Sequence, residues 1–127
     1  MYTGSMGDCV SMIVLWGPVG GVYTNVRGYH GGGGLPNVNW GSLFAGVANH
    51  ATTQVYMVSG TLQGSAYAQN QNVATVNSEI VNAGLTNVTV TFVHGVPGRS
   101  VDRNNVVHPA AEPPVSVPAQ QGCCIVQ

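Results

Sequence analysis

Two stretches near the N-terminus have the hydrophobic patterns of neighbouring β-strands. Residues 10–16 (VSMIVLW) are almost continuously apolar, which is typical of a strand buried on both faces. Residues 22–29 (VYTNVRGY) alternate between apolar and polar positions. The intervening segment, 17–21, is rich in glycine and proline and is typical of a turn. The pattern therefore predicts an antiparallel hairpin over 10–16 and 22–29.

Helical spacing follows the hairpin in two places. Apolar residues recur at helical intervals from Trp40 to Val47, and Asn39 precedes them as an N-cap, which predicts a helix over 39–49. A second apolar stripe predicts a helix over 72–83, with Gly84 in the position of a left-handed C-cap.

Two more strands are expected at 54–59 and 88–93, and a weak edge strand at 101–107. The predicted order is β-β-α-β-α-β, which corresponds to an α/β fold with a small mixed sheet and flanking helices. From Pro109 onward, four prolines punctuate the chain. We therefore expect one domain over 1–108, followed by an extended, proline-rich tail over 109–127.

Charge narrows the classes of function. Only 6% of the 127 residues are charged and the net charge is -1, so the clustered Lys and Arg needed to bind nucleic acid are missing. No apolar run reaches the 18 residues that a membrane span needs. The cysteines and histidines lack zinc-ligand spacing. No metal or cofactor is expected.

Cys9 and His30 are the candidate catalytic residues. Cys9 opens the first predicted strand and His30 follows the second, so the hairpin brings both to the same end of the sheet. An imidazole next to a thiol favours the thiolate, the nucleophile of acyl transfer. A base of this kind needs a third group to orient it, and the Thr3 side chain or carbonyl is the candidate. The alternative, that Cys9 is a small core residue, stays open at this point.

The same residues resemble a known family. Thr3, the Gly7-Asp8-Cys9 segment that leads into a strand, and His30 after the hairpin resemble the chemoreceptor glutamine deamidase CheD. In that family a threonine precedes a Gly-Ser-Cys motif, and Leu-Pro follows the histidine. Here Leu35-Pro36 follows after a glycine insertion. Later segments continue the resemblance in the same order, at 71–73, 83–85 and 95–101.

The resemblance implies a CheD-like fold and hydrolysis of a glutamine side-chain amide on a substrate protein, without a cofactor. Cys9 would be the nucleophile, His30 the base and Thr3 the orienting residue. Tyr29, Gly31 and Gly32 are expected to bind substrate as part of a glycine-rich rim. The cytotoxic necrotizing factors, bacterial toxins that deamidate Rho GTPases, have a similar Cys-His site. A toxin or effector domain acting on a host protein is the expectation that the C-terminal tail, described below, favours.

Several alternatives remain. The chain could be a chemoreceptor deamidase of bacterial chemotaxis, a related transglutaminase or thiol protease, or a catalytically inactive binding domain of the same fold. Asp8, which replaces the family's serine, favours the last of these, because a carboxylate near a thiolate raises the thiol pKa.

The last four residues, 124–127 (CIVQ), fit a C-a-a-X prenylation box. Cys124 is the candidate lipid acceptor, and neighbouring Cys123 could carry a second lipid. This ending predicts attachment to a membrane of a host cell, after secretion into that cell. Without such secretion, the expected location is the bacterial cytoplasm.

Overall fold

The computed structural model describes residues 1–3 and 6–109. It is a small mixed α/β protein with a four-stranded sheet in the order β2-β1-β3-β4. β1 pairs antiparallel with β2 and β3, and β3 pairs parallel with β4. The elements in chain order are β1 (Cys9–Val19), β2 (Val22–Gly32), α1 (Trp40–Phe44), β3 (Gln54–Ser59), the 3-10 turn η1 (Thr61–Gln63), α2 (Ala66–Asn82), β4 (Thr89–Val93), β5 (Ser100–Val101) and β6 (Val107–His108).

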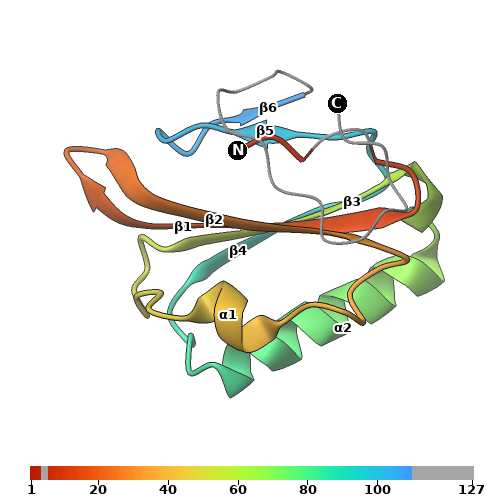
Figure 1. Ribbon diagram of the computed structural model, residues 1–127, viewed down its shortest axis with the longest axis horizontal. Coiled ribbons are helices and arrows are strands. Elements are labelled where there is room, and N and C mark those ends of the chain that lie inside the picture. Colours follow the sequence, from red (N-terminus) through yellow and green to blue (C-terminus); the bar gives the residue numbers. More distant parts are fainter. Residues whose placement is uncertain (4–5, 110–127) are drawn as a thin grey trace.

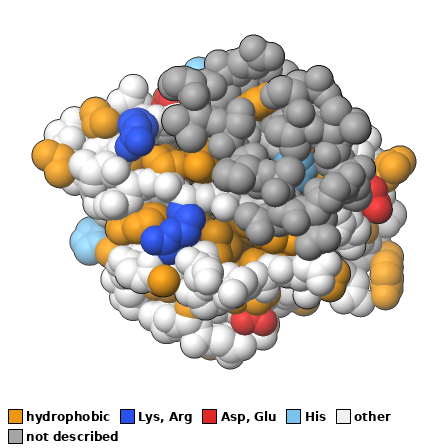
Figure 2. All heavy atoms as spheres, viewed as in Figure 1, with side chains coloured by type: hydrophobic (Ala, Val, Ile, Leu, Met, Phe, Trp, Pro, Cys, Tyr) orange, Lys and Arg blue, Asp and Glu red, His pale blue; other side chains and the backbone are white. Residues whose placement is uncertain are grey.

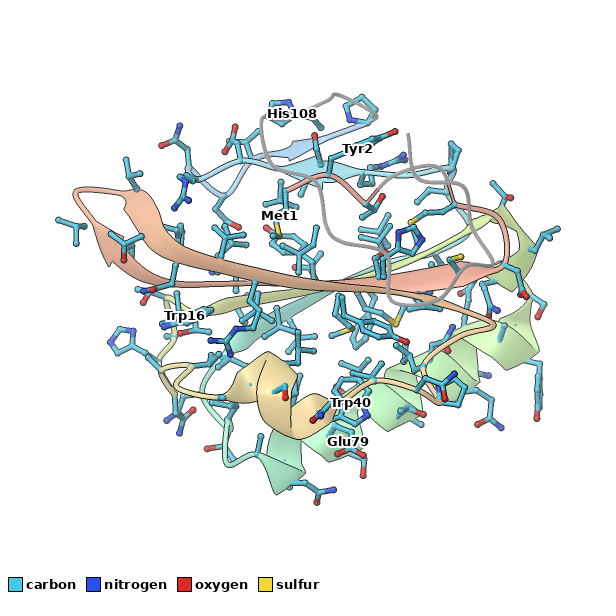
Figure 3. The ribbon with its side chains drawn as sticks, in the orientation of Figure 1. Met1, Tyr2, Trp16, Trp40, Glu79 and His108 are labelled. Carbon is cyan, nitrogen blue, oxygen red and sulfur yellow. The ribbon has the colours of Figure 1, made fainter. Side chains whose placement is uncertain are left out.

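Three layers are stacked in the molecule (Figure 1). The two α-helices lie on one side of the four-stranded sheet, and β5, β6 and the N-terminus lie on the other. Figure 3 shows this division through labelled side chains: Trp40 and Glu79 lie on the helix side, and Tyr2 and His108 on the β5–β6 side.

The predicted hairpin is confirmed and is longer than expected. Residues 17–19 continue β1, and the turn consists of Gly20 and Gly21 alone. Both glycines have positive φ, 59° and 82°, as a two-residue type I′ turn requires. Because this turn matches the right-handed twist of the strands, it sets the register of the whole β1–β2 ladder.

The first helix is much shorter than predicted. Asn39 is its N-cap, as expected, and accepts a hydrogen bond from the Ser42 backbone N–H. The helix ends at Phe44 instead of near residue 49, because Gly46 takes a left-handed conformation with φ 71°. Arg27 of β2 donates hydrogen bonds to three carbonyls at this end, those of residues 42, 43 and 45.

The second helix starts earlier than predicted and ends where predicted. Ser65 caps its N-terminus by accepting a hydrogen bond from the Ala68 backbone N–H. Its polar first turns carry no apolar stripe, which is why the sequence pattern missed them. At the other end Gly84 has φ 74°, and the backbone N–H groups of Gly84 and Leu85 donate to the carbonyls of Val81 and Ile80. This pair of bonds is a Schellman motif.

The strands at 54–59 and 88–93 are confirmed within one residue. The weak edge strand expected at 101–107 is wrong. Instead, β5 and β6 form a separate two-stranded sheet. Asp102 closes their connection by accepting hydrogen bonds from the backbone N–H groups of Asn104 and Val106, and its other oxygen lies 2.8 Å from His108 Nε2.

β1 is buried on both faces, which explains its continuous apolar sequence. On the helix side, Val10, Met12 and Val14 pack in a cluster with Val76 and Ile80 of α2. On the other side, the main cluster contains Ile13, Leu15, Tyr23, Tyr56 and Val101 of β5. The β5–β6 layer is therefore the cover of the second sheet face.

Replacing Gly84 with alanine should destabilise the protein. A left-handed backbone costs a residue with a Cβ roughly 1–2 kcal/mol, although the space around Gly84 is open. Gly41→Ala in α1 is the matched control, since its added Cβ would make only an ordinary 3.6 Å contact with Asn39 Oδ1. Urea unfolding should give a lower midpoint for Gly84→Ala and an unchanged or higher one for Gly41→Ala. Equal effects of both changes would contradict the capping role.

Candidate functional site

The register of the hairpin places Cys9 and His30 on the same face of the sheet. Cys9 pairs with Gly32, and Ser11 pairs with His30. Side chains alternate along a strand, so Cys9 and Ser11 share a face, and His30 lies on it directly opposite Ser11. Cys9 and His30 are therefore diagonal neighbours, a relationship with a typical separation of about 7–8 Å.

The Cys9–His30 hydrogen bond expected from the sequence is not formed. Among the described residues, neither ring nitrogen of His30 has a hydrogen-bond partner, although His30 is only 1% exposed. Diagonal placement explains this result, because the directly opposite position is occupied by Ser11. The structure thus brings the Cys9 and His30 side chains onto one face of the sheet, but no hydrogen bond joins them.

Cys9 lies in a small apolar cluster. It is fully buried and clusters with Met6 and Val58, against which Val93 and Val96 pack. It is also disulfide-bonded, so it is not a free thiol in this structure. The sequence predicted either a reactive thiol or a plain core residue at this position.

Burial has an electrostatic consequence for His30. Removal from water lowers the pKa of the His30 imidazole below its usual value, because the charged form is penalised. His30 is therefore neutral at physiological pH. A neutral imidazole has the lone pair that a general base needs.

Thr3 does not orient His30 through a hydrogen bond, which corrects the sequence prediction. The Thr3 hydroxyl oxygen accepts a 3.0 Å hydrogen bond from the Arg99 backbone N–H, and the Thr3 N–H donates to the Arg99 carbonyl. These bonds attach the N-terminal segment to the chain just before β5. Thr3 is buried, and its bonds to Arg99 thus help to hold the N-terminal segment next to β5.

Asp8 is directed away from Cys9. It is exposed, whereas Cys9 is buried, and its carboxylate accepts a 3.0 Å hydrogen bond from the Gln63 side-chain amide. Gln63 belongs to η1, which follows β3. The carboxylate that raised doubt about thiol reactivity is therefore held at the surface by a neutral partner.

Tyr29, Gly31 and Gly32, which the sequence predicted as a substrate rim, lie at the glycine-rich end of β2. Tyr29 is buried in the core cluster on the helix side, and its hydroxyl lies against Gly31, where an added Cβ would be 1.8 Å from the Tyr29 oxygen. Gly31 is thus required for packing. None of these three residues lines the neighbouring cavity of about 330 Å³, whose rim includes the next two glycines, Gly33 and Gly34.

That cavity is on the helix side of the sheet, between residues 33–36 and α2. Its other lining residues are Leu35, Pro36, Gln63, Tyr67, Ala68, Gln71, Asn72 and Thr75. Cys9 and His30 are on the opposite face and do not line it. A substrate bound there would not reach the Cys9 sulfur in this conformation.

Residues 1–3 and 6–109 form neither a candidate metal site nor a candidate membrane-spanning helix. No group of three potential ligand side chains could hold a metal ion there. No helix in this part of the chain is long and apolar enough to cross a membrane. The face shown in Figure 2 carries few, separated charged side chains among polar and hydrophobic ones.

Comparison with protein-family models, curated proteins and solved structures finds no match to this chain. The resemblance to CheD therefore stays a prediction based on the order of short motifs.

Ser11 is the residue of this face that the sequence analysis missed. It is fully buried, and its hydroxyl has no hydrogen-bond partner in the part of the chain that the structure describes. The available signal was a single serine inside an apolar run, two positions after Cys9 and therefore on the same strand face.

The stability of the protein should fall as the pH drops below about 6.5, the usual His pKa. In the unfolded chain His30 binds a proton below that pH, whereas in the native state its lowered pKa delays protonation. The unfolded state then binds more protons and is favoured by acid. His30→Leu should remove this part of the pH dependence, measured as urea midpoints between pH 7 and 5.

At neutral pH His30→Leu should be neutral or stabilising, because it removes two buried, unpaired ring nitrogens. His50→Leu, at an exposed position, is the control and should retain the acid-dependent loss of stability. An unchanged pH dependence in His30→Leu would contradict this assignment.

Proposed function

We propose that this chain is a protein-glutamine deamidase with Cys9 as nucleophile and His30 as general base. The observation that carries the proposal is their placement as diagonal neighbours on one face of β1 and β2, with a neutral, unpaired imidazole. The motif order shared with CheD supports a glutamine carboxamide as the substrate group.

The chemistry proceeds in two steps. His30 takes the proton of the reduced Cys9 thiol, and the sulfur attacks the carboxamide carbon of a substrate glutamine. The C–N bond breaks, and ammonia leaves with the proton from His30. Water then attacks the thioester while His30 accepts a proton, and the C–S bond breaks to give glutamate and the free enzyme.

Two conditions must be met before this reaction. Cys9 must be reduced, because the disulfide-bonded sulfur carries no thiolate. The layer over this face must also open, because Cys9 and His30 are almost completely buried. Met6 and Val96 belong to that layer, and the backbone N–H of Met6 donates to the Pro97 carbonyl.

The alternative functions predict different products from the same site. A transglutaminase would attach an amine in place of water, a thiol protease would cleave a peptide bond, and a binding domain would leave the target unchanged. A chemoreceptor deamidase and a toxin acting on a host protein would give the same product on different proteins. We favour a toxin or effector because of the prenylation box.

Glutamine deamidation should be lost on removal of either catalytic group. The reduced protein is incubated with a blocked glutamine peptide and with an unfolded glutamine-rich protein, and ammonia release and the mass of the products are measured. Cys9→Ala should abolish the reaction. His30→Ala should lower the rate by roughly 10²–10⁴-fold, the usual contribution of a general base. Amine incorporation or peptide cleavage in place of deamidation would contradict the proposal.

Alkylation tests the nucleophile without a substrate. After reduction, iodoacetamide at pH 7 should label Cys9 faster than Cys123 or Cys124 in partly opened protein, because an adjacent imidazole lowers the pKa of a thiol from about 8.5. Low urea provides the opening. His30→Ala should slow Cys9 alone. Equal labelling of all three thiols in both proteins would favour a non-catalytic domain.

The prenylation box at Cys124, with the neighbouring Cys123, lies outside the described residues. Cys124→Ser should move the protein from membranes to the soluble fraction of eukaryotic cells, because it removes the lipid acceptor. Cell fractionation measures this change, and Ser116→Ala in the same tail serves as the control. An unchanged distribution would remove lipidation from the proposal and leave the catalytic part intact.

A further inference from the structure

Ser11 and His30 form an unusual pair of opposed polar residues in an apolar layer. They are direct partners in the β1–β2 register, and both are almost completely buried. Within residues 1–3 and 6–109, the Ser11 hydroxyl and both His30 ring nitrogens lack hydrogen-bond partners. Buried polar groups are paired in the great majority of native proteins, and unpaired ones concentrate at sites with another role.

The two side chains are placed to pair with one another. Directly opposed residues of an antiparallel pair have Cβ atoms about 4.5–5.5 Å apart. A serine hydroxyl moves between three staggered positions about χ1, and it both donates and accepts hydrogen bonds. A change of rotamer therefore moves the Ser11 oxygen relative to the facing ring, and we expect one rotamer to place it near a ring nitrogen.

Among residues 1–3 and 6–109, no charged group is shown to compete for this role. Burial is the cause of the lowered His30 pKa, and no carboxylate in the described part of the chain contributes to it. Thr3, the residue first expected to orient the ring, holds the Arg99 backbone instead. A neutral hydroxyl is suited to a neutral imidazole in an apolar layer, since it adds no buried charge.

We propose that Ser11 is the positioning residue of His30. After a change of the Ser11 rotamer, the Ser11 oxygen accepts a hydrogen bond from one ring N–H, which fixes the tautomer and leaves the other nitrogen as the base. The catalytic meaning of this arrangement rests on the deamidase function proposed above. The interaction itself is a property of the hairpin and can be measured without any substrate.

The test compares Ser11→Ala with Ser100→Ala in the reduced full-length chain. Ser100 is also a buried serine with an unpaired hydroxyl, but it pairs with His108 and Tyr2 in place of His30. Ring ¹⁵N chemical shifts of His30 are recorded by NMR. Ser11→Ala should change the balance between the two tautomers, and Ser100→Ala should leave it as in the native chain. Ser11→Thr, which keeps a hydroxyl, should restore it.

The second readout is the pH profile of Cys9 alkylation in low urea. Ser11→Ala should reduce the rate at pH 7 by about tenfold or more, a part of the general-base effect of roughly 10²–10⁴. Native-like His30 shifts in Ser11→Ala, or equal changes in both serine variants, would overturn the proposal. Changed shifts in a protein that deamidates no glutamine would support the Ser11–His30 interaction and reject the proposed function alone.

Discussion

The pairing of β1 with β2 is the constraint on which the rest of the structure depends. β1 is the strand through which β2 and β3 are joined, and it is buried on both faces. The Gly20–Gly21 turn sets the register, and a slip of one residue would exchange the two faces of the strand. Cys9, Ser11 and His30 would then lie among different neighbours, so the candidate site is a consequence of that turn.

The two faces of β1 are not equivalent. On the helix side the core is almost entirely apolar and is closed by α2 with its regular caps. On the other side, the small β5–β6 layer covers a face that contains unpaired polar atoms of Ser11 and His30. Each unpaired group costs of the order of 1–3 kcal/mol. Such a cost is common where function and stability conflict. The face covered by β5 and β6 is therefore the better candidate for a functional site.

The covering layer is attached to the sheet by a few specific polar contacts. Tyr56 of β3 donates to the Asn105 side chain, and Arg103 donates to the Tyr23 carbonyl at 2.9 Å. Thr3 joins the N-terminal segment to Arg99. These contacts hold the β5–β6 layer on the sheet face that contains Cys9 and His30.

The sequence by itself determined the elements whose signals are local. The hairpin, the strands at 54–59 and 88–93, the Asn39 cap and the Gly84 end of α2 follow from periodicity and from backbone preferences of single residues. Only the tertiary structure decided which side chains meet. Strand register places Ser11 opposite His30, the Thr3 hydroxyl accepts a hydrogen bond from the Arg99 backbone, and Tyr29 is buried in the core. Sequence patterns do not predict these contacts, because they depend on pairing between distant segments.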